Sequence, residues 1–207
     1  MRTTLDRVDR WLRSITRTAC LAAGWMILAL SVVVVINIFL RKMFSFSLQG
    51  VDEYGGYCLA LAASIGFSQA AFDRAHIRID VVTSHFPLRL RAVFDVLALL
   101  ALNATGWFIA LQAFGVLQAS FVGGAQATSV LRTPLAYPQG LWVAALLWFC
   151  LVLSIQALRA VVTLLLADWT GIVDNFGVPD VDQEVRQEIE AARRRVGKKL
   201  GPAGSTL

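Results

Sequence analysis

The chain contains few of the residue types that usually act in catalysis or bind metals and cofactors. Two of its 207 residues are histidines, His76 and His85, and three are cysteines. Both histidines fall in one short polar stretch, so they cannot hold a haem between two helices as membrane cytochromes do. Cys20, Cys58 and Cys150 lie far apart in or beside apolar stretches, which excludes a disulfide framework or a zinc motif. The sequence therefore predicts no catalytic residues, no cofactor and no metal site.

Four long apolar stretches occupy most of the chain. They are residues 17–40, 52–72, 92–118 and 136–166. Each reaches the ~20 residues that a helix needs to cross a bilayer, and the composition agrees, at 57% hydrophobic. The sequence predicts an all-α membrane protein with a four-helix transmembrane domain over residues 1–166 and a tail over residues 167–207.

Ionisable residues are scarce inside these stretches. Asp52 and Glu53 stand at the start of the second span, and Asp95 and Arg159 stand within a turn or two of a span end. A protein that moves ions by itself usually has a carboxylate or a broken helix in mid-membrane. The uncharged polar residues are expected to hydrogen-bond between helices; they are Asn37, Gln69, Asn103, Gln112 and Gln156. An accessory subunit is favoured, and a stand-alone homo-oligomeric transporter or channel is the alternative.

Basic residues orient the predicted spans. Five arginines precede the first span, and further clusters lie between the second and third spans and after the fourth. Because such residues are retained on the cytoplasmic side, both termini are predicted to be cytoplasmic. Residues 1–40 also resemble a signal peptide in their basic start, but the apolar run is a full span long and no small-residue cleavage site closes it. The net charge of +5 is thus explained by topology, and nucleic-acid binding is not expected.

The tail contains a predicted cytoplasmic helix over residues 180–198. Asp180 suits its N-cap, with glutamates early and arginines late, as the helix dipole prefers. We interpret it as a solvated surface helix; a docking or lipid-binding segment is the alternative.

The spans differ in the residues that they place on their faces. The second span repeats small residues every four positions, which lets a neighbouring backbone approach closely. The first row is Gly56, Ala60, Ser64 and Ser68, and the second is Ala62, Gly66 and Ala70. We therefore expect the second span to be the most enclosed helix. The first span, rich in Val and Ile, and the fourth, rich in Leu and Trp, are expected to suit lipid contact.

Short motifs follow one another in a recognisable order between and beside the spans. These are Arg41 and Phe44 after the first span, Asp52 and Glu53 opening the second, Gly66 late in it, then Arg74, His76 and Asp80 ahead of Pro87, and a linker ending at Pro134. Over roughly residues 15–165 this order resembles the DctQ-like small membrane subunit of tripartite ATP-independent periplasmic (TRAP) transporters. The family often has Trp where this chain has Gly50.

Each motif has a structural and a functional interpretation. Asp52 and Glu53 either form a charge cluster with Arg41 and Lys42 or simply cap the second span. The loop with Arg74, His76 and Asp80 either forms a rigid turn or contacts a partner subunit.

The resemblance implies that this chain is a non-catalytic subunit. Such subunits assemble with a large permease subunit in the bacterial inner membrane, and an extracytoplasmic solute-binding protein delivers the substrate. The implied system takes up small organic solutes, such as organic acids, with sodium. The chain itself would be a scaffold in contact with the large subunit and with membrane lipid.

Overall fold

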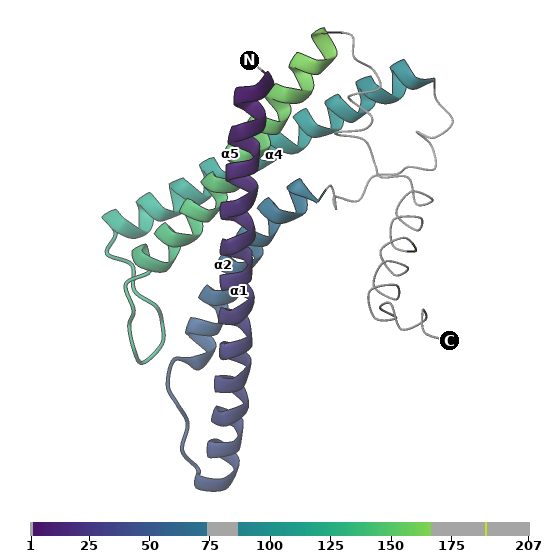
Figure 1. Cartoon of the computed structure of the whole chain (residues 1–207). Helices are drawn as coiled ribbons and strands as arrows, with labels where there is room; N and C mark the ends of the chain where they lie inside the picture. The colour runs from purple at the N-terminus through teal and green to yellow at the C-terminus, as the bar shows by residue number, and fades with distance from the viewer. Residues whose placement is uncertain (1, 74–86, 167–188, 190–207) are drawn as a thin grey trace, which may run out of the picture.

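A computed structural model describes residues 2–73, 87–166 and residue 189 (Figure 1). It contains four helices, namely α1 (Arg2–Phe44), α2 (Val51–Phe72), α4 (Leu88–Val122) and α5 (Ala136–Leu165). Each helix is long and apolar enough to cross a membrane, so the prediction of four membrane helices is confirmed. The predicted helix over residues 180–198 lies outside the described residues except for Ile189.

Helix α1 begins fifteen residues before the predicted span. No proline or glycine occurs between Arg2 and Ala23, so nothing in the sequence interrupts the helix there. Its 43 residues measure about 65 Å at 1.5 Å per residue, roughly twice the thickness of the hydrocarbon core. The basic first turns of α1 therefore extend beyond the hydrocarbon core.

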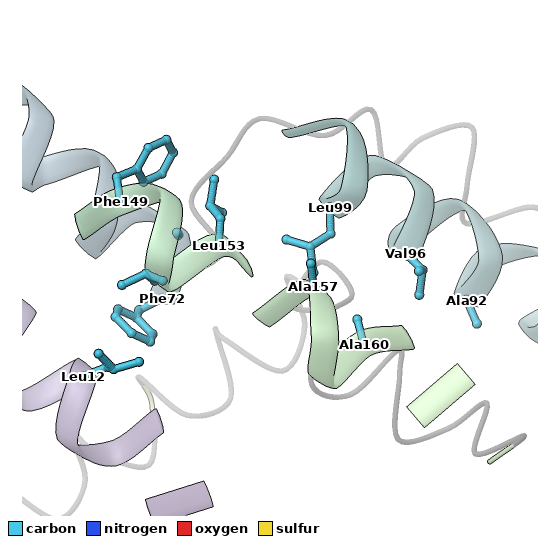
Figure 2. Packing of buried hydrophobic residues seen from close by; sticks show 11 residues of the cluster. Leu12, Phe72, Ala92, Val96, Leu99, Phe149, Leu153, Ala157 and Ala160 are labelled. Carbon is cyan, nitrogen blue, oxygen red and sulfur yellow. The ribbon is translucent and has the colours of Figure 1, made fainter. Parts of the chain in front are cut away.

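The helices form two antiparallel pairs that cross one another. Figure 1 shows α1 beside α2 and, at an angle to them, α4 beside α5. Helix α5 packs on both α4 and α2, and near its N-terminus α1 also reaches α5. The main hydrophobic core lies at this crossing (Figure 2) and includes Leu12 of α1, Phe72 of α2 and the α5 side chains Phe149 and Leu153. The order across the layer is thus α1, α2, α5, α4.

Helix α5, and not α2, is the most enclosed helix of the described chain. In its most apolar window 44% of the residues are buried, against 22% in α2 and 6% in α1. In the predicted small-residue row of α2, Ser64 and Ser68 are buried, whereas Gly56 and Ala60 are exposed. The expectation that the second span is the most enclosed is therefore wrong. The fourth span, which was expected to suit lipid contact, is the most enclosed one, although Leu141, Leu151 and Leu158 remain exposed.

Small residues of α4 explain the burial of α5. A Cβ on Gly106 would lie 3.4 Å from both Leu153 Cδ1 and Phe149 Cε1. Ala110 and Ala113 follow on the same face and are buried as well. Because these side chains are short, α4 approaches α5 closely along that face. The enclosing small residues thus stand on the third span as well as on the second, where Ser64, Ser68 and Ala71 are buried.

Candidate functional site

The α1–α2 and α4–α5 connections meet at a hydrogen-bonded cluster around Glu53. The Glu53 carboxylate accepts a hydrogen bond from the Tyr57 hydroxyl at 2.9 Å and another from the Ser129 hydroxyl. The Thr133 hydroxyl is a further partner. Since Glu53 lies in the first turn of α2 and Ser129 in the α4–α5 connection, this carboxylate joins the two helix pairs. We call Glu53, Tyr57, Ser129 and Thr133 the loop cluster.

The α4–α5 connection presents these hydroxyls from a short hairpin-like turn. The Ala127 amide donates to the Thr133 carbonyl at 2.9 Å, and the Leu135 amide donates to the Ala125 carbonyl at 3.0 Å. Pro134 forms an isolated antiparallel bridge with Gln126 between these two bonds. The predicted linker residue Pro134 therefore helps to shape the turn that carries Ser129 and Thr133.

Gly50 is required by the contact between the same two connections. Its φ of 85° is in the left-handed region that favours glycine. A Cβ at this position would also overlap Leu131 Cδ1, which comes from the α4–α5 connection. In the sequence, Gly50 appears only as a departure from the family pattern. The need for glycine there could not be predicted, because it arises from a tertiary contact with Leu131.

Of the two interpretations of Asp52 and Glu53, the charge cluster with Arg41 and Lys42 is not formed among the described residues. Arg41 lies in the last turn of α1, and Asp52 lies in the first turn of α2; both side chains are exposed. Among the described residues, neither Arg41 nor Lys42 forms an ion pair with Glu53, whose partners are hydroxyl groups. The connection after α1 is fixed instead by Asn37, whose Oδ1 accepts a hydrogen bond from the Leu48 amide at 2.8 Å.

A second polar cluster holds the N-terminal part of α1 against α2 and α5. The Arg13 guanidinium lies 5.1 Å from the Phe72 ring centroid and 3.5 Å from the Phe72 carbonyl, at the end of α2. Asp9 forms an ion pair with Arg159 of α5 at 2.8 Å, and the Trp148 indole donates to the Thr16 hydroxyl at 3.0 Å. The α1 residues that make these contacts share one helix face.

This face was missed at the level of sequence, although a signal for it exists. Asp9, Leu12, Arg13 and Thr16 recur at helical spacing before the predicted span. Leu12 and Thr16 are buried in the structure. The helical spacing of these four residues was overlooked because the arginines of this segment were interpreted only as topology signals.

Polar side chains also join α4 to α5 within the membrane segment. The Trp107 indole donates to Ser154 Oγ at 3.0 Å, and Ser154 in turn donates to Asn103 Oδ1 at 3.1 Å. The expected interhelical role of Asn103 is therefore confirmed. Gln69 instead bonds to Asp73 at the end of its own helix, at 2.8 Å.

The other predicted site residues fall into two groups. Gly66 is part-exposed, and nothing lies within 4 Å of a Cβ built on it. Its face of α2 is therefore not covered by any of the described residues. Arg74, His76 and Asp80 lie outside the described residues. Within the part of the chain that the structure describes, no group of three His, Cys, Asp or Glu residues converges as a metal site.

The sequence was also compared with models of known protein families. Residues 30–163 match the model of the DctQ component of tripartite ATP-independent periplasmic transporters. The chain belongs to this family. The match covers more than half of the chain and includes α2, α4, α5 and the loop cluster. Comparisons with curated proteins and with solved structures give no match.

Membership of the family confirms the resemblance drawn from the order of the motifs. The chain is a multi-pass membrane component of a TRAP transport system. The basic N-terminal turns of α1, including the face that binds α2 and α5, precede the matched residues.

Proposed function

We propose that the chain is the non-catalytic small membrane subunit of a sodium-coupled, binding-protein-dependent TRAP transporter that takes up small organic solutes, organic acids foremost. Its role is to scaffold the large permease subunit in the bacterial inner membrane, with both termini in the cytoplasm. The family match over residues 30–163 is the observation that carries this proposal.

The distribution of packing supports a bracing role. Helix α5 is held between α2 and α4, and the loop cluster and the Asp9–Arg159 pair tie the crossing helix pairs together at separate places. Within the described part of the chain, helix α1 and one face of α2 are uncovered over much of their length. A rigid interior with open outer helices is what a membrane brace needs in order to hold a larger partner.

Reconstitution separates this role from that of a stand-alone carrier. Proteoliposomes are prepared with the chain alone, with the large subunit alone, and with both, and solute flux is measured with the loaded binding protein outside. We expect flux only with both subunits, and only when the gradient is of sodium rather than choline. Flux from the chain alone would instead establish an independent transporter or channel.

Subunit association tests the open face of α2. Gly66→Trp places a large side chain on this face, where nothing in the chain obstructs it. We expect the variant to fold normally and to recover less large subunit on co-purification. Gly115→Trp is the matched control, because Gly115 of α4 is equally unobstructed. Equal recovery from both variants would place the large subunit on another face.

A further inference from the structure

An open groove runs along α1 beside the C-terminal half of α2. Its volume is about 410 Å³, and it is lined by Arg17, Leu21, Gly24, Trp25 and Leu28 of α1, among others, and by Gln69 of α2. This size is within the range of small-ligand sites. The lining is almost entirely apolar apart from Arg17 and Gln69.

Gly24 forms the floor of the groove, and Leu21 and Trp25 stand to one side of it. No atom of the described residues lies within 4 Å of a Cβ built on Gly24. Leu21 and Trp25 have 60% and 70% of their surface exposed, so both are available for contact with an apolar chain.

The length of the groove matches one leaflet of a bilayer. Arg17 and Leu28 are eleven residues apart on α1, which corresponds to about 16 Å along the helix axis. Half of a ~30 Å hydrocarbon core is roughly the same length. A single acyl chain extended through one leaflet therefore spans the groove from end to end.

Charged and polar groups stand at the membrane boundary of the groove. Arg13, one turn before Arg17, binds the carbonyl that ends α2, so Arg17 lies at the level of the last turn of α2. Arg17 is exposed and makes no hydrogen bond or ion pair within the described residues. The Oε1 atom of Gln69 is buried and is therefore not accessible from the groove. The exposed guanidinium of Arg17 suits a phosphate.

We propose that this groove binds an anionic phospholipid, such as phosphatidylglycerol. Arg17 binds its phosphate, and one acyl chain lies over Gly24 between α1 and α2. The site belongs to this chain and does not depend on its role in transport. A helix of another protein is the competing occupant; the match of the groove to one leaflet and the exposed Arg17 guanidinium favour the lipid.

Lipid retention by the full-length protein tests the proposal. The protein is extracted in mild detergent, exchanged into nanodiscs of equal phosphatidylglycerol and phosphatidylcholine with identical acyl chains, and released for native mass spectrometry. We expect phosphatidylglycerol to be retained preferentially. Arg17→Gln is expected to reduce that preference roughly fivefold, the effect of one base near an anionic headgroup.

Variants at the floor of the groove separate a lipid from a protein occupant. Gly24→Leu is expected to abolish retention of phosphatidylglycerol, while Gly56→Leu and Arg41→Gln are expected to leave it unchanged. Gly56 is equally unobstructed, and Arg41 lies at the opposite end of α1. Equal retention of both lipids by the wild type, or a Gly24→Leu variant that keeps its lipid but loses a co-purifying protein, would overturn the proposal.

Discussion

Helices α1 and α5 are similar in composition and opposite in environment. The most apolar window of α1 has a mean hydropathy of 2.6 and is 6% buried, and that of α5 has a mean hydropathy of 2.2 and is 44% buried. In water the more apolar helix would be the interior one. In a bilayer, lipid tails are as apolar as a protein core, so hydropathy places a helix in the membrane but does not choose its neighbours. Packing shape makes that choice, and here Gly106 and the alanines of α4 enclose α5.

The largest expected effect is the loss of a leucine from α5 compared with one from α1. Leu153→Ala removes a fully buried side chain and leaves a cavity, which is expected to lower the free energy of unfolding by ~2–5 kcal/mol. Leu28→Ala, at a side chain that is 55% exposed, is expected to stay within ~0.5 kcal/mol. Titration with sodium dodecyl sulfate in mixed micelles, followed by circular dichroism, measures both. Equal losses would contradict the assignment of α5 as the interior helix.

The second effect concerns the close approach of α4 to α5. Gly106→Leu forces a side chain against Leu153 and Phe149 and is expected to cost ~1–3 kcal/mol of stability. Gly115→Leu on the same helix meets nothing and is expected to have no destabilising effect. The same titration is used for both variants. Wild-type stability of the Gly106 variant would mean that α4 and α5 are farther apart than described.

A smaller effect is expected at the ion pair between α1 and α5. The Asp9 and Arg159 side chains are 17% and 22% exposed, so a double-mutant cycle with Asp9→Asn and Arg159→Gln should give a coupling energy of ~1 kcal/mol. The cycle of Asp9→Asn with Arg41→Gln is the control, with no coupling expected. Zero coupling in the first cycle would show that α1 is not held against α5 by this pair.

The smallest expected effect is local to the loop cluster. Ser129→Ala removes the hydroxyl that donates to Glu53 and is expected to weaken the α4–α5 connection by ~1 kcal/mol. Hydrogen exchange of the Ala127 and Leu135 amides measures this loss, because both amides close the turn. Thr128→Ala, at an exposed neighbouring residue, should leave their exchange unchanged. Slow exchange in the Ser129 variant would mean that the turn forms without Glu53.

The sequence predicted the features that are determined within one segment. It missed the features that depend on contacts between two segments. Apolar length indicated the four membrane helices, and the order of short motifs indicated the family. The burial of α5 was missed because it depends on Gly106 of another helix. The need for Gly50 was likewise hidden, since it arises from Leu131, which is distant in the chain. The site of Arg74, His76 and Asp80 stays a prediction.

The proposed function requires that this chain is one part of a larger membrane assembly. Purification of the tagged full-length chain from its native membranes in mild detergent, followed by quantitative mass spectrometry, tests this most directly. The account predicts recovery of a large multi-span permease in a fixed stoichiometric ratio. Recovery of the chain alone, as a stable homo-oligomer, would contradict it.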